Sequence, residues 1–226
     1  MLSYWEQQSF LHYDYIVIGA GIVGLNTAIE LRVKYPVARI LVLERGLLPT
    51  GASSRNAGFA CMGSLTELLD DAQYSDAAEI VALYELRKKG LEQLRARLGD
   101  ATIGYAANGS YELISMQELP ALDKIEYLNN LLMPVTGKPA FQLVNEKIAQ
   151  FGFNKDYTQA LIENTCEGEL NTGRMLRALT NYAIINGIEI KTGAEVIRFE
   201  DVGKEVMVEI AHPVRGESLI LEGNAI

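Results

Sequence analysis

Cysteine and histidine are scarce in this sequence of 226 residues. The cysteines are Cys61 and Cys166, and the histidines are His12 and His212. Two thiols far apart in the chain do not make a disulfide framework, and so few sulfur and imidazole groups argue against a metal site. Because unpaired cysteines are typical of a reducing compartment, the sequence predicts a cytoplasmic protein without a bound metal.

A long apolar run and an excess of basic residues are also missing. No window of about 18 apolar residues is present, so we expect no transmembrane helix. Residues 1–13 lack the basic stretch and apolar stretch of a signal peptide. The sequence has 20 lysines and arginines and 29 acidic residues. The resulting net charge of −9 argues against a nucleic-acid partner.

Apolar residues make up 49% of the chain, enough for a sizeable core in one large domain or two small ones. Apolar runs over 13–18 and 39–43 predict two buried strands, and helical spacing of apolar residues predicts a helix over 22–34 between them. Strand, helix and strand in this order form a βαβ unit. The sequence therefore predicts an α/β fold with a parallel sheet.

Helices and strands alternate along the rest of the chain. Asp76 and Glu79 have the spacing of a capping box, and Asn108-Gly109 is the turn signal of a hairpin or of paired strands over 105–115. Loops are expected over 46–63 and 134–139. Other helices are expected over 65–73, 76–98, 117–132 and 171–186, and other strands over 158–163, 188–191, 195–199, 205–210 and 218–221.

The last three strands resemble a small antiparallel meander. Gly223 to Ile226 resembles the start of a further buried strand. Because half of the ladder of such a strand would be missing, we expect the sequence to be a fragment of a longer protein.

Gly19, Gly21 and Gly24 form a G-x-G-x-x-G sequence between the first strand and the helix. In a dinucleotide-binding fold these glycines permit a tight turn, the approach of a pyrophosphate, and close helix–strand packing. Ile22 and Val23 begin the helix, where their N–H groups are free to bind phosphate. The alternative is a glycine-rich turn that binds nothing, but the position between strand and helix favours a cofactor.

Glu44 follows the second strand at the spacing expected for an acid that binds ribose. Its carboxylate can accept hydrogen bonds from both hydroxyls of an adenosine ribose, which favours an unphosphorylated ribose over NADP. NAD and FAD share this arrangement, so both stay open at this point.

A second run of small residues, from Gly51 to Gly58, suits a ligand that extends beyond the ribose, as FAD does. Ser53 and Ser54 can donate to phosphate or ribitol, and Arg55 can offset the charge of a reduced flavin. The alternative is a solvated serine- and glycine-rich loop. The predicted cofactor-binding residues of this run are Gly51, Ala52, Ser53, Ser54, Arg55, Asn56, Ala57 and Gly58.

These segments resemble the N-terminal part of FAD-dependent oxidoreductases of the D-amino-acid oxidase superfamily, such as glycine oxidase and sarcosine oxidase. The resemblance is carried by residues 15–24, 43–46 and 51–58, and more weakly by 167–171 and 187–197. It implies FAD as the cofactor, Arg45 as a further contact, and contacts of backbone groups at Val196 with the adenine.

The resemblance also implies two domains. Residues 14–98 and 155–226 would form a Rossmann-like FAD-binding domain, and 99–154 an inserted, incomplete substrate domain with an antiparallel sheet. The flavin would take hydride at N5 from the C–N bond of an amine or amino acid, or from the C–O bond of a 2-hydroxy acid. An NAD-dependent dehydrogenase and a non-catalytic flavin-binding subunit are the alternatives. Catalytic residues, the small-molecule substrate, the electron acceptor and any oligomer stay unassigned.

Overall fold

The computed structural model describes residues 3–211 and 218–225, which form two compact units. One unit comprises Met1–Asn56 and Thr172–Ile226, and the other comprises Ala57–Asn171. These bounds differ from the ranges expected for the two domains, because the helix over 77–98 and the strand over 160–164 belong to the second unit. The assignment of a FAD-binding and a substrate domain to particular ranges stays a prediction.

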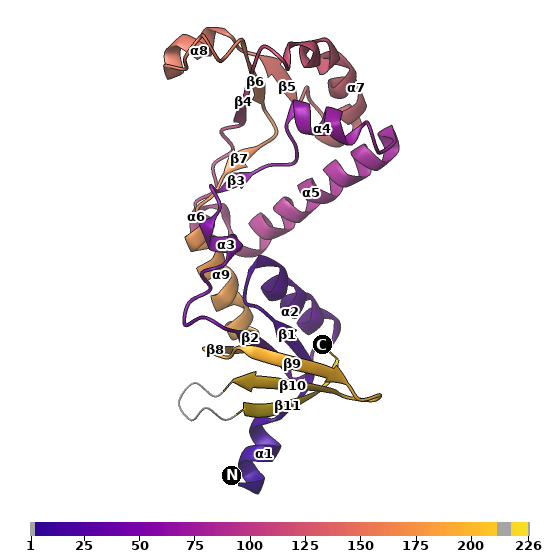
Figure 1. The fold of residues 1–226 in the computed structure, drawn as a ribbon, viewed down its shortest axis with the longest axis vertical. Coiled ribbons are helices and arrows are strands. Elements are labelled where there is room, and N and C mark those ends of the chain that lie inside the picture. Colours follow the sequence, from indigo (N-terminus) through magenta and orange to yellow (C-terminus); the bar gives the residue numbers. More distant parts are fainter. Residues whose placement is uncertain (1–2, 212–217, 226) are drawn as a thin grey trace. The chain divides into compact units, whose positions relative to one another are not determined.

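A mixed sheet of 6 strands forms the centre of the first unit, in the order β8-β2-β1-β11-β10-β9 (Figure 1). The strands from β8 to β11 pair in parallel, and β11, β10 and β9 pair as an antiparallel meander. The α/β class, the parallel sheet and the meander are therefore confirmed. The strands are β1 (His12–Ile18), β2 (Ile40–Glu44), β8 (Glu189–Thr192), β9 (Val196–Asp201), β10 (Val206–Ala211) and β11 (Ser218–Ala225).

Helices α2 (Ile22–Lys34) and α9 (Thr172–Ile185) pack against each other and against β1, β2 and β8. Leu41 and Leu43 of β2 share a buried cluster with Val208 of β10, although two strands separate β2 from β10. The cluster also contains Ile16 of β1 and Leu221 of β11, so one buried apolar face runs across four neighbouring strands. The short helix α1 (Tyr4–Phe10) precedes β1 and buries no residue. No helix in the described ranges is both long and apolar enough to cross a membrane.

Strand β11 is continuous, so the prediction that a new strand starts at Gly223 is wrong. Its first part pairs with β10, and Glu222, Gly223 and Ala225 pair with β1. A Cβ on Gly223 would lie 3.1 Å from Ile16 Cδ1. The glycine therefore provides room for packing within the strand and does not interrupt it. Ile226 lies outside the described residues.

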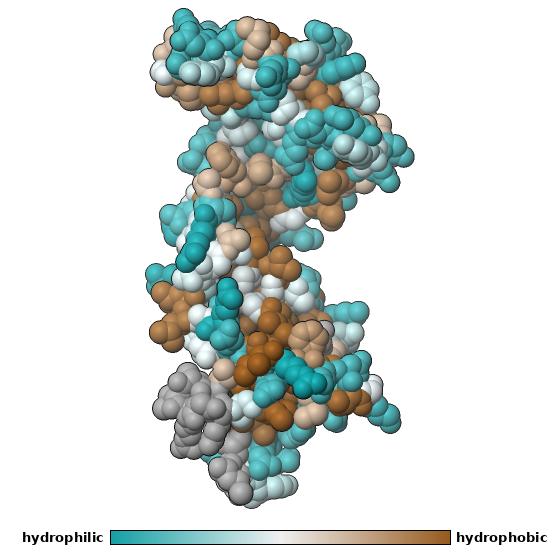
Figure 2. All heavy atoms as spheres, in the orientation of Figure 1, coloured by the Kyte–Doolittle hydropathy of each residue, from teal (hydrophilic) through white to brown (hydrophobic). Residues whose placement is uncertain are grey.

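Strand β9 is the last strand of this sheet, and apolar side chains reach the surface along it. Ile197 and Phe199 are each 59% exposed. On the face drawn in Figure 2, apolar residues lie among hydrophilic ones over the meander. In the part of the chain that the structure describes, no strand pairs with the outer edge of β9.

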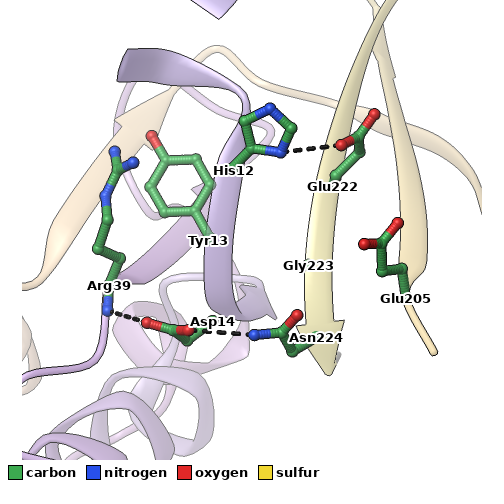
Figure 3. A pocket seen from close by; sticks show the side chains of 8 residues that line it. All are labelled: His12, Tyr13, Asp14, Arg39, Glu205, Glu222, Gly223 and Asn224. Atoms are coloured by element: carbon green, nitrogen blue, oxygen red, sulfur yellow. Dashed lines mark hydrogen bonds and ion pairs between the residues drawn. The ribbon is translucent and has the colours of Figure 1, made fainter. Parts of the chain in front are cut away.

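A pocket of about 190 Å³ lies where β1 begins (Figure 3). His12 Nδ1 is 2.8 Å from Glu222 Oε2. The Asp14 carboxylate accepts hydrogen bonds from the Arg39 backbone N–H, at 2.7 Å, and from Asn224 Nδ2, at 3.1 Å. Because these polar groups satisfy one another, they connect β1 to β11 and to the residue before β2.

An antiparallel sheet in the order β4-β6-β5 lies at the centre of the second unit, as expected for an inserted part. A separate antiparallel pair joins β3 to β7. The strands are β3 (Phe59–Ala60), β4 (Ser110–Ile114), β5 (Phe141–Leu143), β6 (Ala160–Asn164) and β7 (Gly168–Glu169). The helices are α4 (Leu65–Asp71), α5 (Ala77–Leu98), α6 (Asp100–Ile103), η1 (Leu119–Lys124), α7 (Ile125–Thr136) and α8 (Glu146–Phe151).

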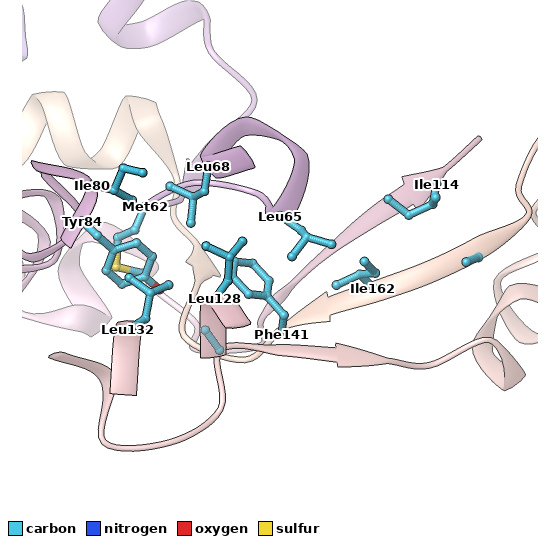
Figure 4. Packing of buried hydrophobic residues seen from close by; sticks show 12 residues of the cluster. Met62, Leu65, Leu68, Ile80, Tyr84, Ile114, Leu128, Leu132, Phe141 and Ile162 are labelled. Carbon is cyan, nitrogen blue, oxygen red and sulfur yellow. The ribbon is translucent and has the colours of Figure 1, made fainter. Parts of the chain in front are cut away.

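Buried side chains from α4, α5, α7 and the sheet form one core in this unit (Figure 4). Leu65, Tyr84, Leu128 and Phe141 are at most 1% exposed. The capping box of α5 is confirmed, because the Asp76 carboxylate accepts the backbone N–H of Glu79 at 2.9 Å. This cap fixes the start of the long helix that contributes Tyr84.

Three local expectations are wrong. β4 pairs with β6, so residues 105–115 form no hairpin of their own. Helix α7 continues through Pro134 as far as Thr136, and Gly137 with φ +69° ends it. The segment 46–63 contains the short helix α3 (Ala52–Arg55) and β3 and is not only a loop.

Candidate functional site

A pocket of about 400 Å³ opens in the first unit, where β1 and β2 end and α2 begins. This is the carboxyl end of the parallel strands, where open α/β sheets bind their ligands. Seven of the predicted cofactor residues line it, namely Gly19, Gly21, Glu44, Arg45, Gly51, Ser53 and Val196. The other lining residues are Ile18, Leu43, Gly46, Pro49, Thr50, Leu176, Ala194 and Glu195.

Each glycine of the first motif is required for a different geometric reason. Gly19 has φ +97°, which residues with a Cβ rarely adopt. A Cβ on Gly24 would lie 2.0 Å from the Gly19 carbonyl oxygen, so only glycine lets α2 pack this closely on the end of β1. A Cβ on Gly21 would lie 3.0 Å from Ser53 Oγ. The motif therefore provides an open turn against which Ser53 packs.

The second run of small residues reaches the first through Ser53. This residue lies on α3, and its Oγ accepts the Ile22 backbone N–H at 3.0 Å. Val23, the next residue of α2, is 75% exposed. The N-terminus of α2 and the hydroxyl of Ser53 thus lie together at the pocket, which suits an anionic group.

Both carboxylate oxygens of Glu44 are held by the backbone. Oε2 accepts the Ala20 N–H at 3.0 Å, and Oε1 accepts the Gly46 N–H at 2.9 Å. A carboxylate has about four acceptor positions, so both oxygens can still accept a hydroxyl group. Glu44 is therefore fixed in place with acceptor capacity left at the pocket.

Residues 194–196 form another part of the pocket lining. The Ala194 N–H donates to the Glu44 carbonyl oxygen at 2.9 Å, and the Gly193 N–H donates to that of Gly46 at 3.0 Å. These bonds hold the start of β9, including Val196, against the end of β2. Ala194 and Glu195 were missed from the sequence although they directly precede Val196. Leu176 was also missed, because nothing local marks one residue of α9 as a pocket residue.

The remaining predicted residues do not line the pocket. Ser54 Oγ donates to the Pro49 carbonyl oxygen at 2.9 Å, which fixes the loop before α3. Arg55 and Asn56 are exposed. Ile22, Val23 and Gly24 lie in α2, Ala52 lies in α3, and Ala57 and Gly58 belong to the second unit. Their roles toward a cofactor stay predictions.

Metal ligands do not gather anywhere in the described ranges, where no group of three or more His, Cys, Asp or Glu residues could hold an ion. His212 lies outside the described residues.

The model of the "FAD dependent oxidoreductase" family, DAO, matches residues 14–220. The chain belongs to this family. The family cofactor is FAD. The glycine motif left NAD and FAD open, and the family decides for FAD. The pocket fits it: the turn at Gly19 is open, Glu44 keeps acceptor capacity, and Ser53 presents its hydroxyl beside the N-terminus of α2. Members of the family are oxidoreductase enzymes.

Several solved structures have the same fold. Glycine oxidase from Geobacillus kaustophilus is 20% identical with a TM-score of 0.65, and the match covers 93% of this chain and 54% of that one. L-Amino acid deaminase from Proteus myxofaciens is 19% identical with a TM-score of 0.67, covering 94% and 44%. L-α-Glycerophosphate oxidase from Mycoplasma pneumoniae, with FAD bound, is 17% identical with a TM-score of 0.66, covering 94% and 52%. The DAO chain thus spans about half the length of these structures.

A local similarity links the DAO chain to L-2-hydroxyglutarate dehydrogenase of Escherichia coli (strain K12). The two are 49% identical over 37 residues, which is 16% of this chain and 9% of that relative. The similarity is therefore confined to a short stretch.

Proposed function

We propose that this DAO chain binds FAD in the pocket at the carboxyl end of β1 and β2, as part of an enzyme that oxidises an amino acid, an amine or a 2-hydroxy acid. The observation that carries the proposal is the convergence of Gly19, Ser53 and Glu44 on one pocket. A cytoplasmic location also stays a prediction.

Different residues of the pocket would bind different parts of the cofactor. The hydroxyl of Ser53, which accepts the Ile22 N–H, would donate its own hydrogen to the pyrophosphate, supported by the positive end of the α2 dipole. Glu44 would accept the ribose hydroxyls, and the backbone at Val196 would meet the adenine. Arg45 lines the pocket, where its charge would offset that of the phosphates. FAD, when bound, would supply the redox chemistry by accepting hydride at flavin N5.

The substrate classes are proposed from relatives of known activity. Solved structures with this fold include a glycine oxidase and an L-amino acid deaminase, and the local relative is a 2-hydroxy acid dehydrogenase by name. Amino acids and 2-hydroxy acids both have a hydrogen on a carbon that bears nitrogen or oxygen, next to a carboxylate, and amines have the same C–H beside nitrogen. We therefore propose oxidation at that carbon.

Anaerobic mixing of the FAD-loaded protein with single substrates tests this proposal. We expect the visible absorbance of the flavin to be lost with members of one class, either amino acids and amines or 2-hydroxy acids. A substrate deuterated at the carbon that loses hydride should lower the rate of this loss. Dithionite serves as the control for a reducible flavin. Reduction by dithionite but by no substrate of either class would contradict the proposed activity.

Glu44→Ala is expected to weaken FAD binding by about 1.5–3 kcal/mol, or about ten- to 150-fold in Kd. The reason is the loss of an ionised acceptor for the ribose hydroxyls. The measurement is a titration of the apoprotein with FAD, followed by flavin fluorescence. Glu44 also holds the backbone at Ala20 and Gly46, so thermal unfolding of the apoprotein is measured in parallel.

Glu205→Ala is the matched control, because Glu205 is an exposed acid of the same unit that lines the other pocket. It should leave the Kd for FAD unchanged. A Kd for Glu44→Ala equal to that of the control would show that Glu44 does not bind the cofactor.

A further inference from the structure

The outer edge of β9 has backbone groups available for pairing. The Val202 N–H donates to the Glu205 carbonyl oxygen at 2.9 Å, so the backbone of Val202 faces the strand that follows it, β10. In an antiparallel ladder the backbone groups of successive residues face opposite sides. The backbone N–H and C=O groups of Arg198 and Glu200 therefore face β10. Those of Phe199 and Asp201 face outward.

The charges along this edge are self-complementary. Arg198 and Glu200 form an exposed ion pair within one copy of the chain. In its own sheet Arg198 lies opposite Glu209, whereas Glu200 lies opposite Met207. A second copy related by a twofold axis at Phe199 would pair Phe199 with its equivalent, through the outward-facing backbone groups of both. In the same register, Arg198 of each copy lies opposite Glu200 of the other copy, so two opposite-charge pairs form.

Side chains on the edge also favour pairing. Phe199 and Ile197 are more than half exposed, and residues 197–201 include no proline or lysine to discourage another strand. On the opposite edge of the sheet, β8 has few apolar side chains and carries Lys191. Aromatic and opposite-charge pairs across an antiparallel ladder are both stabilising.

We infer that β9 is a homodimerisation edge, on which a second copy of this chain adds its own β9 in antiparallel orientation about Phe199. The two sheets then form one continuous sheet through the dimer. This pairing rests on no property of the cofactor pocket. Because a single strand pair is smaller than a standard interface, the expected Kd is on the order of micromolar.

Charge reversal at the two ionic positions tests the register. Arg198→Glu alone sets two carboxylates opposite each other across the interface, and Glu200→Arg alone sets two guanidinium groups together. Each variant should raise the dimer Kd on the order of 100-fold, because like charges face each other twice. An equimolar mixture of the two variants restores both opposite-charge pairs. Analytical ultracentrifugation of the FAD-loaded proteins should therefore show heterodimers of near-native affinity.

Lys191→Glu on β8 is the matched control, since it makes the same change of charge on the other edge of the sheet. It should leave the dimer unchanged. Phe199→Thr retains a residue suited to strands and should weaken the dimer on the order of tenfold. Circular dichroism and FAD content verify that each variant is folded.

Three results would overturn the inference. One is a native protein that stays monomeric from about 1 to 300 μM, a range that brackets the expected Kd. Another is a dimer that Arg198→Glu, Glu200→Arg and Phe199→Thr all leave intact. The third is a mixture of folded charge variants that stays monomeric.

Discussion

Gly24→Ala is expected to destabilise the first unit by about 3 kcal/mol or more and to abolish the retention of FAD. The added Cβ would lie 2.0 Å from the Gly19 carbonyl oxygen and 3.3 Å from Val17 Cγ1. Gly19 cannot easily move away, because its N–H is bonded to the Leu43 carbonyl oxygen at 2.7 Å. Helix α2 would have to shift from β1, which would open the turn at the pocket. Chemical denaturation and the flavin content of the purified protein measure the two effects.

Gly90→Ala is the matched control for this substitution. Gly90 also lies inside a helix, α5, but a Cβ there would meet nothing within 4 Å. Alanine is a better helix former, so this variant should be more stable by about 0.5–1 kcal/mol. If Gly24→Ala unfolds at the same denaturant concentration as the native protein and retains FAD, the close packing of α2 on β1 is required neither for stability nor for FAD binding.

Glu167→Ala is expected to lower the free energy of unfolding of the second unit by about 3–5 kcal/mol. The Glu167 carboxylate is buried, at 3% exposure. It accepts the backbone N–H of Met62 at 2.6 Å and that of Gly63 at 3.1 Å, and the Ser110 hydroxyl at 2.6 Å. Removing it leaves two buried backbone N–H groups and the part-buried Ser110 hydroxyl without this acceptor. Urea denaturation followed by circular dichroism measures the loss.

Glu167→Gln keeps one acceptor oxygen and should lose less than the alanine variant. Glu169→Ala removes an exposed acid two residues further along and should change the stability by less than about 0.5 kcal/mol. Equal stabilities for Glu167→Ala and Glu169→Ala would mean that water replaces the carboxylate without cost.

Features with a local cause could be predicted from the sequence. The helix over 22–34 was predicted at both ends, because a glycine motif precedes it and Pro36 follows it. The capping box at Asp76 and the meander have similar local signals. The turn after β1 and Glu44 were predicted to lie together, since adjacent parallel strands end at one edge of a sheet.

Features that depend on distant partners could not be predicted. The turn at Gly109 was recognised, and it has φ +73°, but β4 pairs with β6 about 50 residues further on. Gly223 was interpreted as the start of a new strand because its packing against Ile16 is not visible in the local sequence. Leu176 reaches the pocket only because α9 packs beside α2.

The central position of β11 has a consequence for synthesis. Asp14 near the start of β1 and Asn224 near the end of β11 are 210 residues apart in the sequence. At about 5–20 residues per second, the ribosome needs roughly 10–40 s to make that stretch, and until then β1 has one unpaired edge. All of Ala57–Asn171 is made within this interval. The second unit therefore emerges completely before the sheet of the first can close, although the first unit contains the beginning of the chain.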